Sequence, residues 1–141
     1  MTAPTLRARD LMTRDPISLT PQTRILDVYE LFVQEEIHGA PVIGEDGIVY
    51  GVVSTLDLLR AVREALDPED VTVEDAMTRE LVMVDPDASA SEVARTMLDH
   101  RIHRVLVGDS DRMLAGVITT FDLLRAITPP AGTTEQTRYG R

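Results

Sequence analysis

Two hydroxyl–carboxylate pairs are the residues of this chain best suited to hold a ligand. The first pair is Ser54 with Asp57, and the second is Thr119 with Asp122. Each pair follows an apolar run predicted to be a strand, at a strand-to-helix turn where α/β proteins tend to place ligands. An ionised carboxylate offers two acceptor oxygens, which suit the two adjacent hydroxyl donors of a ribose. The pairs therefore predict ribose binding.

The same pairs also have a purely structural interpretation. A Ser or Thr N-cap followed three residues later by an acidic side chain resembles a capping box, and the negative charge suits the helix dipole. Asp reaches back less readily than Glu, yet both positions hold Asp, which favours a ligand. The two interpretations are compatible, because Ser54 can cap a helix while Asp57 binds.

Composition excludes several kinds of chemistry. The chain has neither cysteine nor lysine, which removes cysteine-ligated zinc, the phosphate-binding lysine of a P-loop and Schiff-base catalysis. No base is evident beside Ser54 or Thr119, so we expect no enzyme. His100 and His103 have a spacing that suits a metal, but no third ligand is evident, so we expect no metal site.

Charge and hydropathy bear on partners and location. The net charge of −10 argues against nucleic acid as a main partner. No apolar run approaches the ~20 residues of a membrane helix, and Met1–Pro4 does not begin a signal-peptide core. We therefore expect a cytoplasmic protein that contacts no membrane.

The two pairs belong to an internal repeat with a uniform offset of 65 residues. Asp10–Pro21 aligns with Asp75–Pro86, and Gly51–Ala61 aligns with Gly116–Ala126, without insertion or deletion. One register kept across separated blocks indicates a duplication. A unit of roughly 55 residues has a thin core by itself, so we expect the two units to pack sheet to sheet as one pseudo-symmetric module.

Each unit is predicted to run strand, helix, strand, strand, helix. Thr20-Pro21 and Asp85-Pro86 are typical of an N-cap followed by proline at the first helical position, so the first helix of each unit is expected to start there. Apolar runs and turn residues predict the other elements of unit one, namely strands at 17–19, 40–43 and 48–53 and a helix at 55–66. Unit two repeats them, with strands at 105–107 and 113–118 and a helix at 120–128. The fold class is α/β (α+β), with repeats at 6–66 and 75–128, a linker at 67–74 and a mobile tail at 129–141.

These repeats resemble a tandem pair of CBS (cystathionine-β-synthase-type) domains, which form a Bateman module. The resemblance rests on the Met-Thr that opens each unit, the Ile-His before the middle strand, and the closing blocks Gly51–Asp57 and Gly116–Asp122. It covers about Leu6 to Ile127. It implies a regulatory module that binds AMP, ADP, ATP or S-adenosylmethionine in clefts between the repeats, and that often forms a homodimer.

The resemblance also implies phosphate and adenine contacts. A His-Arg pair before the middle strand commonly contacts phosphate in the family, and His103-Arg104 matches it, whereas His38 is followed by Gly39. Arg is permanently charged and fork-shaped, so we expect unequal sites, with tighter binding where Arg104 contributes. If the carboxylates hold ribose, the phosphates must lie away from those helix N-termini, and His38, His103 and Arg104 are the candidates.

Two strand positions complete the expected site. Ile17 and Val82 match family positions whose backbone lies against adenine, although an ordinary core position is the simpler interpretation of each side chain. Leu106 stands where the first repeat has Pro41, a departure that alters the adenine pocket of one site.

Three functions remain open from the sequence. The first is a nucleotide sensor that signals by conformational change to an unidentified regulated protein. The second is a constitutive dimerisation scaffold with a vestigial site. The third, an enzyme that uses Asp57 and Asp122 as paired carboxylates, is disfavoured because the two residues are equivalent members of two repeats.

Overall fold

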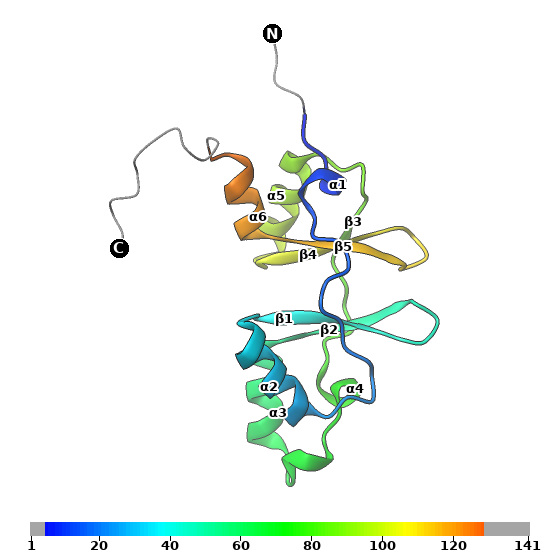
Figure 1. Ribbon diagram of the computed structural model, residues 1–141, viewed down its shortest axis with the longest axis vertical. Coiled ribbons are helices and arrows are strands. Elements are labelled where there is room, and N and C mark those ends of the chain that lie inside the picture. Colours follow the sequence, from blue (N-terminus) through cyan, green and yellow to red (C-terminus); the bar gives the residue numbers. More distant parts are fainter. Residues whose placement is uncertain (1–4, 129–141) are drawn as a thin grey trace, which may run out of the picture.

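The fold is seen in a computed structural model, which describes residues 5–128. Two small sheets are stacked on each other, and a pair of helices covers the outer side of each (Figure 1). The elements in chain order are α1 (Ala8–Leu11), α2 (Ile25–Glu35), β1 (Gly39–Ile43), β2 (Val49–Ser54), α3 (Thr55–Glu64), the 3-10 helix η1 (Pro68–Asp70), α4 (Val73–Ala76), β3 (Met83–Val84), α5 (Ala90–His100), β4 (Arg104–Gly108), β5 (Leu114–Thr119) and α6 (Thr120–Ala126). The tail predicted to be mobile, 129–141, lies outside the described residues.

The two sheets differ by one strand. One sheet is the antiparallel hairpin β1-β2, and the other has the order β3-β4-β5, with β3 parallel to β4 and β4 antiparallel to β5. The two hairpins keep the same register, and each has an irregularity at the equivalent place, Val42/Ile43 and Val107/Gly108. The predicted fold class of two similar α/β repeats is confirmed.

Three apolar clusters hold the molecule together. One lies between the first hairpin and α2 and α3, and a second lies between the second sheet and α5 and α6. The third lies between the sheets, around Val49, Leu106 and Val117. Burial of each such side chain contributes about 1.5–3 kcal/mol, so the predicted sheet-to-sheet packing supplies a core that neither repeat has alone.

The short helices α1 and α4 each pack in the half that contains the sheet of the other repeat. Ala8 near the N-terminus is fully buried in the core of the second half, and its N–H donates to the carbonyl of Ala88 at 2.7 Å. Val73 is fully buried in the core of the first half, and its N–H donates to Thr23 at 2.8 Å. The chain therefore crosses between the halves before each repeat begins its own sheet.

The predicted start of the first helix of each unit was wrong, whereas the second helices start at Thr55 and Thr120 as predicted. α2 begins at Ile25 and α5 at Ala90, four residues after the proline in each case. The Asp85 side chain accepts from the N–H of Asp87 at 2.8 Å, which makes a turn and not an N-cap. Ser89 caps α5 instead, because its Oγ accepts from the N–H of Glu92 at 3.1 Å while the Glu92 carboxylate accepts from its N–H at 2.8 Å.

The predicted strand at 17–19 was also wrong, since only Leu19 pairs with β1. Leu19 donates its N–H to Pro41 at 2.9 Å, and its carbonyl accepts from the N–H of Ile43 at 2.8 Å. In the second half the ladder reaches further, because Leu106 donates its N–H to the carbonyl of Val82 at 3.1 Å. Pro41 has no N–H, so the matching bond to Ile17 cannot form.

Candidate ligand-binding cleft between the two sheets

Both hydroxyl–carboxylate pairs form complete capping boxes. Ser54 Oγ accepts from the N–H of Asp57 at 3.1 Å, and Asp57 Oδ2 accepts from the Ser54 N–H at 2.9 Å. Thr119 and Asp122 repeat the arrangement at 3.3 and 2.8 Å. Both carboxylates are only 7% exposed. The structural interpretation is therefore realised in each repeat, with one carboxylate oxygen committed to the cap.

The second carboxylate oxygen has different surroundings in the two halves. Asp57 Oδ1 accepts from the hydroxyl of Thr78 at 3.2 Å, and Arg60 lies 3.9 Å away. Asp122 Oδ1 is bonded to Arg125, whose side chain is 60% exposed. Thr13 is the counterpart of Thr78, and no hydrogen bond joins it to Asp122 in the described structure. The second oxygen of Asp57 is thus held by a hydroxyl of α4's C-terminal flank, and that of Asp122 by an exposed arginine of its own helix.

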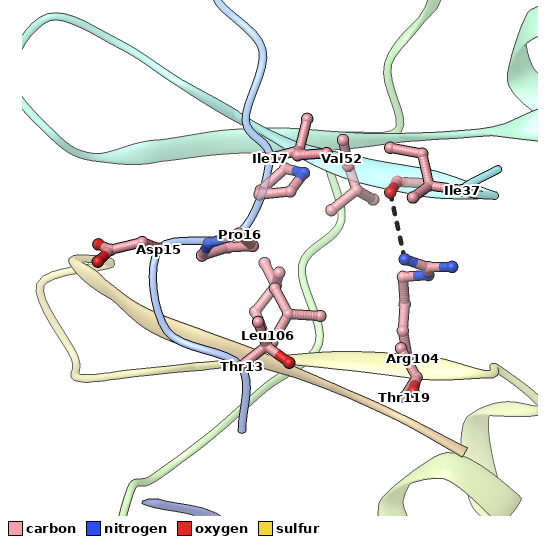
Figure 2. Close-up of a pocket in the computed structure, with 13 residues that line it drawn as sticks. Thr13, Asp15, Pro16, Ile17, Ile37, Val52, Arg104, Leu106 and Thr119 are labelled. Atoms are coloured by element: carbon pink, nitrogen blue, oxygen red, sulfur yellow. Dashed lines mark hydrogen bonds between the residues drawn. The ribbon is translucent and has the colours of Figure 1, made fainter. Parts of the chain in front are cut away.

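A cavity of about 300 Å³ lies between the two sheets. Its walls come from both halves and from the segment that crosses between them (Figure 2). They are largely apolar, and the lining residues are Thr13, Asp15, Pro16, Ile17, Ile37, Gly39, Ala40, Pro41, Val52, Arg104, Leu106, Val117 and Thr119. Mostly apolar walls with a few polar groups are typical of a small-molecule site.

Arg104 is the one basic residue that lines this cavity. Its side chain extends from β4 across to the other sheet, where Nη1 donates to the carbonyl of Gly39 at 3.2 Å (Figure 2). Burial lowers the pKa of Arg104 from its usual value, yet a guanidinium stays protonated at neutral pH. No ion pair within residues 5–128 includes Arg104, so a positive charge faces the cavity without a carboxylate beside it.

Gly39 makes this placement of Arg104 possible. A Cβ atom on Gly39 would lie 3.2 Å from Arg104 Nε and 3.3 Å from its Cζ. The two residues are counterparts in the repeat, 65 positions apart. A side chain at position 39 would press against that of Arg104, so glycine there leaves the space to Arg104.

The cavity brings together only some of the residues that the sequence predicted. Ile17, Arg104 and Thr119 line it, and Asp122 belongs to the cap that starts at Thr119. His38 and His103 do not line it. Their side chains are exposed, and their carbonyls accept from the N–H groups of Thr55 and Thr120 at 3.0 and 2.9 Å. Both histidines thus help to start α3 and α6.

Val82, Ser54 and Asp57 lie outside the cavity. Val82 is half-buried and packs against the core of the second half. Asp57 lines a separate, polar hollow of about 240 Å³ between α3 and α4, with Glu64 and Asp75 nearby. Three carboxylates outnumber the one guanidinium around that hollow, that of Arg60, which makes it a poor place for a phosphate.

Sequence reasoning did not foresee the roles of three residues near the cavity and the carboxylates. Thr13 and Thr78 open the two repeats, but the Met-Thr signature gave no reason to assign them a role at the site. Pro41 was noted as a difference from Leu106, and its effect on the neighbouring strand was not foreseen. The signal was present, because proline in a strand removes one N–H from a ladder.

Metal and membrane signatures were also sought along residues 5–128. No group of three or more His, Asp or Glu side chains in that range has the arrangement of a metal site. None of the helices there has the length and apolar character needed to cross a bilayer.

Known proteins share this arrangement. The chain is 34% identical over 121 residues to YlbB of Bacillus subtilis, covering 83% of this chain and 79% of YlbB. The crystal structure of AcuB from Vibrio cholerae matches with a TM-score of 0.80 and 27% identity, covering 86% and 90% of the two chains. CBSX2 of Arabidopsis thaliana, solved in complex with AMP, matches with a TM-score of 0.77 and 30% identity, covering 85% and 94%.

The length of other relatives differs from that of this chain. This chain spans only 24% to 42% of the length of four further curated relatives, which are larger proteins. The model of the CBS domain matches twice, at residues 8–64 and 73–129. These two matches keep the offset of the repeat and cover most of the chain, which therefore belongs to the CBS domain family and carries two tandem copies of the domain.

Proposed function

We propose that this chain is a regulatory module that binds an adenine nucleotide, AMP, ADP or ATP, in the cleft between its two sheets. The observation that carries the proposal is the apolar cavity into which one unpaired guanidinium projects. Apolar walls suit a purine ring, and a guanidinium fork suits a phosphate. The AMP complex of CBSX2, a relative of the same fold, supports this ligand class.

In this proposal each part of the nucleotide has its own protein group. The backbone at Ile17 lies along the adenine, Thr119 and Asp122 hold the ribose, and Arg104 binds the phosphate. To reach the ribose, Asp122 keeps Oδ2 in the cap and turns Oδ1 from Arg125 to a sugar hydroxyl. Val82, Ser54 and Asp57 are the counterparts of Ile17, Thr119 and Asp122 in the other repeat. His38 and His103 lie directly before the strands β1 and β4.

The proposed output is a change in the relative position of the two halves. The cavity is lined by both sheets and by the crossing segment at 13–17, so a ligand contacts all three at once. A ligand shifts a conformational equilibrium by its difference in affinity for the two states. A regulated partner protein then distinguishes the states, and S-adenosylmethionine is the alternative ligand.

We also propose that the chain performs no reaction on the nucleotide. Asp15 is the one acidic group that lines the cavity, and the lining set has no histidine to act as a general base. A nucleotide incubated with the protein is expected to be recovered intact. Release of free phosphate or adenine above a protein-free control would contradict this.

We propose, second, that the chain forms a homodimer. A homodimer is also what the competing function, a constitutive scaffold, requires. Exposed apolar side chains lie on all four long helices, namely Leu26, Tyr29, Val33, Leu56, Leu59, Val62, Leu98, Phe121 and Leu124. These helices lie toward the same edge of the stacked sheets (Figure 1). So many exposed apolar groups are typical of a surface that a protein partner covers.

Equilibrium dialysis separates the sensor from the scaffold. The chain is dialysed against AMP, ADP, ATP and S-adenosylmethionine, and thermal unfolding is followed with each ligand in excess. A ligand present at 100 times its Kd stabilises the folded state by about 2.7 kcal/mol, which shifts the midpoint visibly. Saturable binding of an adenine nucleotide supports the sensor, and no binding at millimolar ligand favours the scaffold.

A further inference from the structure

We infer that each chain holds one nucleotide and not two, and that the choice of cleft is made by Pro41. This inference rests on the proposed function, because it concerns the same ligand. The repeat has two equivalent places for a ligand, one beside Thr119 and one beside Ser54. The structure leaves the first open and closes the second, for reasons that can be traced to single residues.

The first reason is a hydrogen bond that only one half can make. The segments before the sheets, residues 13–19 and 78–84, are called here the first and second opening segments. In the second, the carbonyl of Val82 accepts the Leu106 N–H at 3.1 Å and the segment continues as β3. In the first, Pro41 has no N–H to give to Ile17. The first opening segment therefore leaves β1 before Leu19, and the cavity lies where it has separated.

Burial along the two opening segments follows this difference. Ile17 is 38% exposed and Ser18 is exposed, whereas their counterparts Val82 and Met83 are half-buried. Leu81, the counterpart of Pro16, packs with Met83 and Leu106 in the cluster between the sheets. Side chains thus fill the second cleft in the place where the first cleft has its cavity.

The second reason is that the space between the sheets takes only one guanidinium. Arg104 supplies it to the first cleft, and its counterpart Gly39 has no side chain to supply one to the second. A phosphate in the first cleft therefore has a guanidinium to bind, and a phosphate in the second cleft has none.

Isothermal titration of the full chain with AMP measures the number of sites. One AMP per chain is the expected result. Two AMP per chain would overturn the inference while leaving the proposed function intact. No binding of AMP, ADP, ATP or S-adenosylmethionine would instead remove the proposed function, and the inference with it, so the two failures are distinguishable.

One substitution then tests the cause. Leu106→Pro removes the N–H that holds the second opening segment, so the chain should bind two molecules of adenosine, which needs no guanidinium, where the unaltered chain binds one. A Leu106→Pro protein that melts cooperatively and still binds one adenosine would overturn the role of the hydrogen bond.

The reverse change gives an independent test should Leu106→Pro not fold. Pro41→Ala supplies the missing N–H without added bulk, so the first opening segment can pair with β1 and close the cavity. AMP should bind about tenfold more weakly, the size expected of one added competing hydrogen bond. Pro68→Ala, the same change in η1 away from the cleft, should bind like the unaltered chain. Equal affinities for Pro41→Ala and Pro68→Ala would contradict the inference.

Discussion

Arg104 carries a permanent charge into a mainly apolar space between two sheets. One backbone carbonyl accepts from it, and its remaining N–H groups are available to an anion. A cation removed from water costs free energy unless an opposite charge compensates it. A bound phosphate offsets that cost. The buried charge of Arg104 therefore destabilises the unliganded chain, and ligand binding removes this destabilisation.

Replacement of Arg104 should weaken phosphate recognition selectively. Arg104→Gln removes the charge and keeps a side chain that can donate to Gly39. A hydrogen bond to a charged group contributes about 1.5–3 kcal/mol, so the Kd for AMP should rise about 10- to 100-fold in isothermal titration. Adenosine has no phosphate and should bind both proteins with similar affinity. An equal loss for adenosine would mean that Arg104 shapes the cavity and does not bind the phosphate.

The two capping residues should contribute to stability in each half. Ser54→Ala and Thr119→Ala each remove the side chain that accepts from the third helical N–H. Each change should lower the free energy of unfolding by about 1 kcal/mol in urea titration. Ser110→Ala, an exposed hydroxyl in a hairpin turn, is the matched control and should unfold like the unaltered chain. An unchanged free energy of unfolding in both variants would contradict this account of α3 and α6.

The sequence predicted part of this site. The spacing Ser54–Asp57 and its repeat contained both the cap and the candidate ribose contact, and the cap is confirmed. Arg104 was a candidate because His103-Arg104 matches the family's His-Arg pair, and Gly39 marked the departure of the first repeat from it. The reach of its side chain to Gly39 depends on the distance between two sheets, which no local pattern contains.

At the scale of elements, the offset of 65 residues predicted most of the fold. Helices and hairpins recur at that offset because the same residues make the same local structure twice. The strand predicted at 17–19 failed for a reason that local patterns cannot supply: the residue that prevents it, Pro41, lies in another strand. The predicted starts of α2 and α5 failed because Thr20 and Asp85 favour turns as well as caps.

The short helix α4 should matter to the stability of the half it joins. Val73 is fully buried in the core of the first half. Val73→Ala should lower the free energy of unfolding by about 2 kcal/mol, from lost burial and the cavity left behind. Leu66→Ala, at a fully exposed position, should change it little. A small effect at Val73 would mean that α4 does not hold the halves together.

Helix α5 should show a dependence on pH that comes from its cap. The N–H and hydroxyl of Ser89 hold the pKa of Glu92 below its usual value. A carboxyl whose pKa is lower in the folded state stabilises it above the unfolded pKa, and this contribution is lost as pH falls through the folded pKa. Glu92→Gln should therefore lose stability at neutral pH and flatten the acid side of the melting profile. Parallel profiles for the two proteins would contradict the assignment.

At the scale of the molecule, two repeats build one core and one cleft between them. The crossing of α1 and α4 ties each half to the opening segment of the other, so neither half is expected to fold alone. The long helices remain with apolar faces exposed, and a dimer would cover them.

Charge placed on those faces should separate the subunits. Phe121 is 64% exposed on α6, beside Arg125. Phe121→Glu should convert a dimer to a monomer in sedimentation equilibrium, because removing a carboxylate from water at an apolar interface costs several kcal/mol. Glu30→Gln, which removes a charge on α2 without adding apolar bulk, serves as a control for general charge effects. A monomeric unaltered chain at high concentration would contradict the proposed homodimer.

The most direct measurement of the central claim is an NMR titration of the ¹⁵N-labelled chain with AMP. Amide shifts should gather at Thr13–Ile17, Gly39–Ala40 and Thr119, the walls of the cavity, and should saturate. Shifts that gather elsewhere, or none at millimolar AMP, ADP and ATP, would show that the cleft between the sheets does not bind an adenine nucleotide.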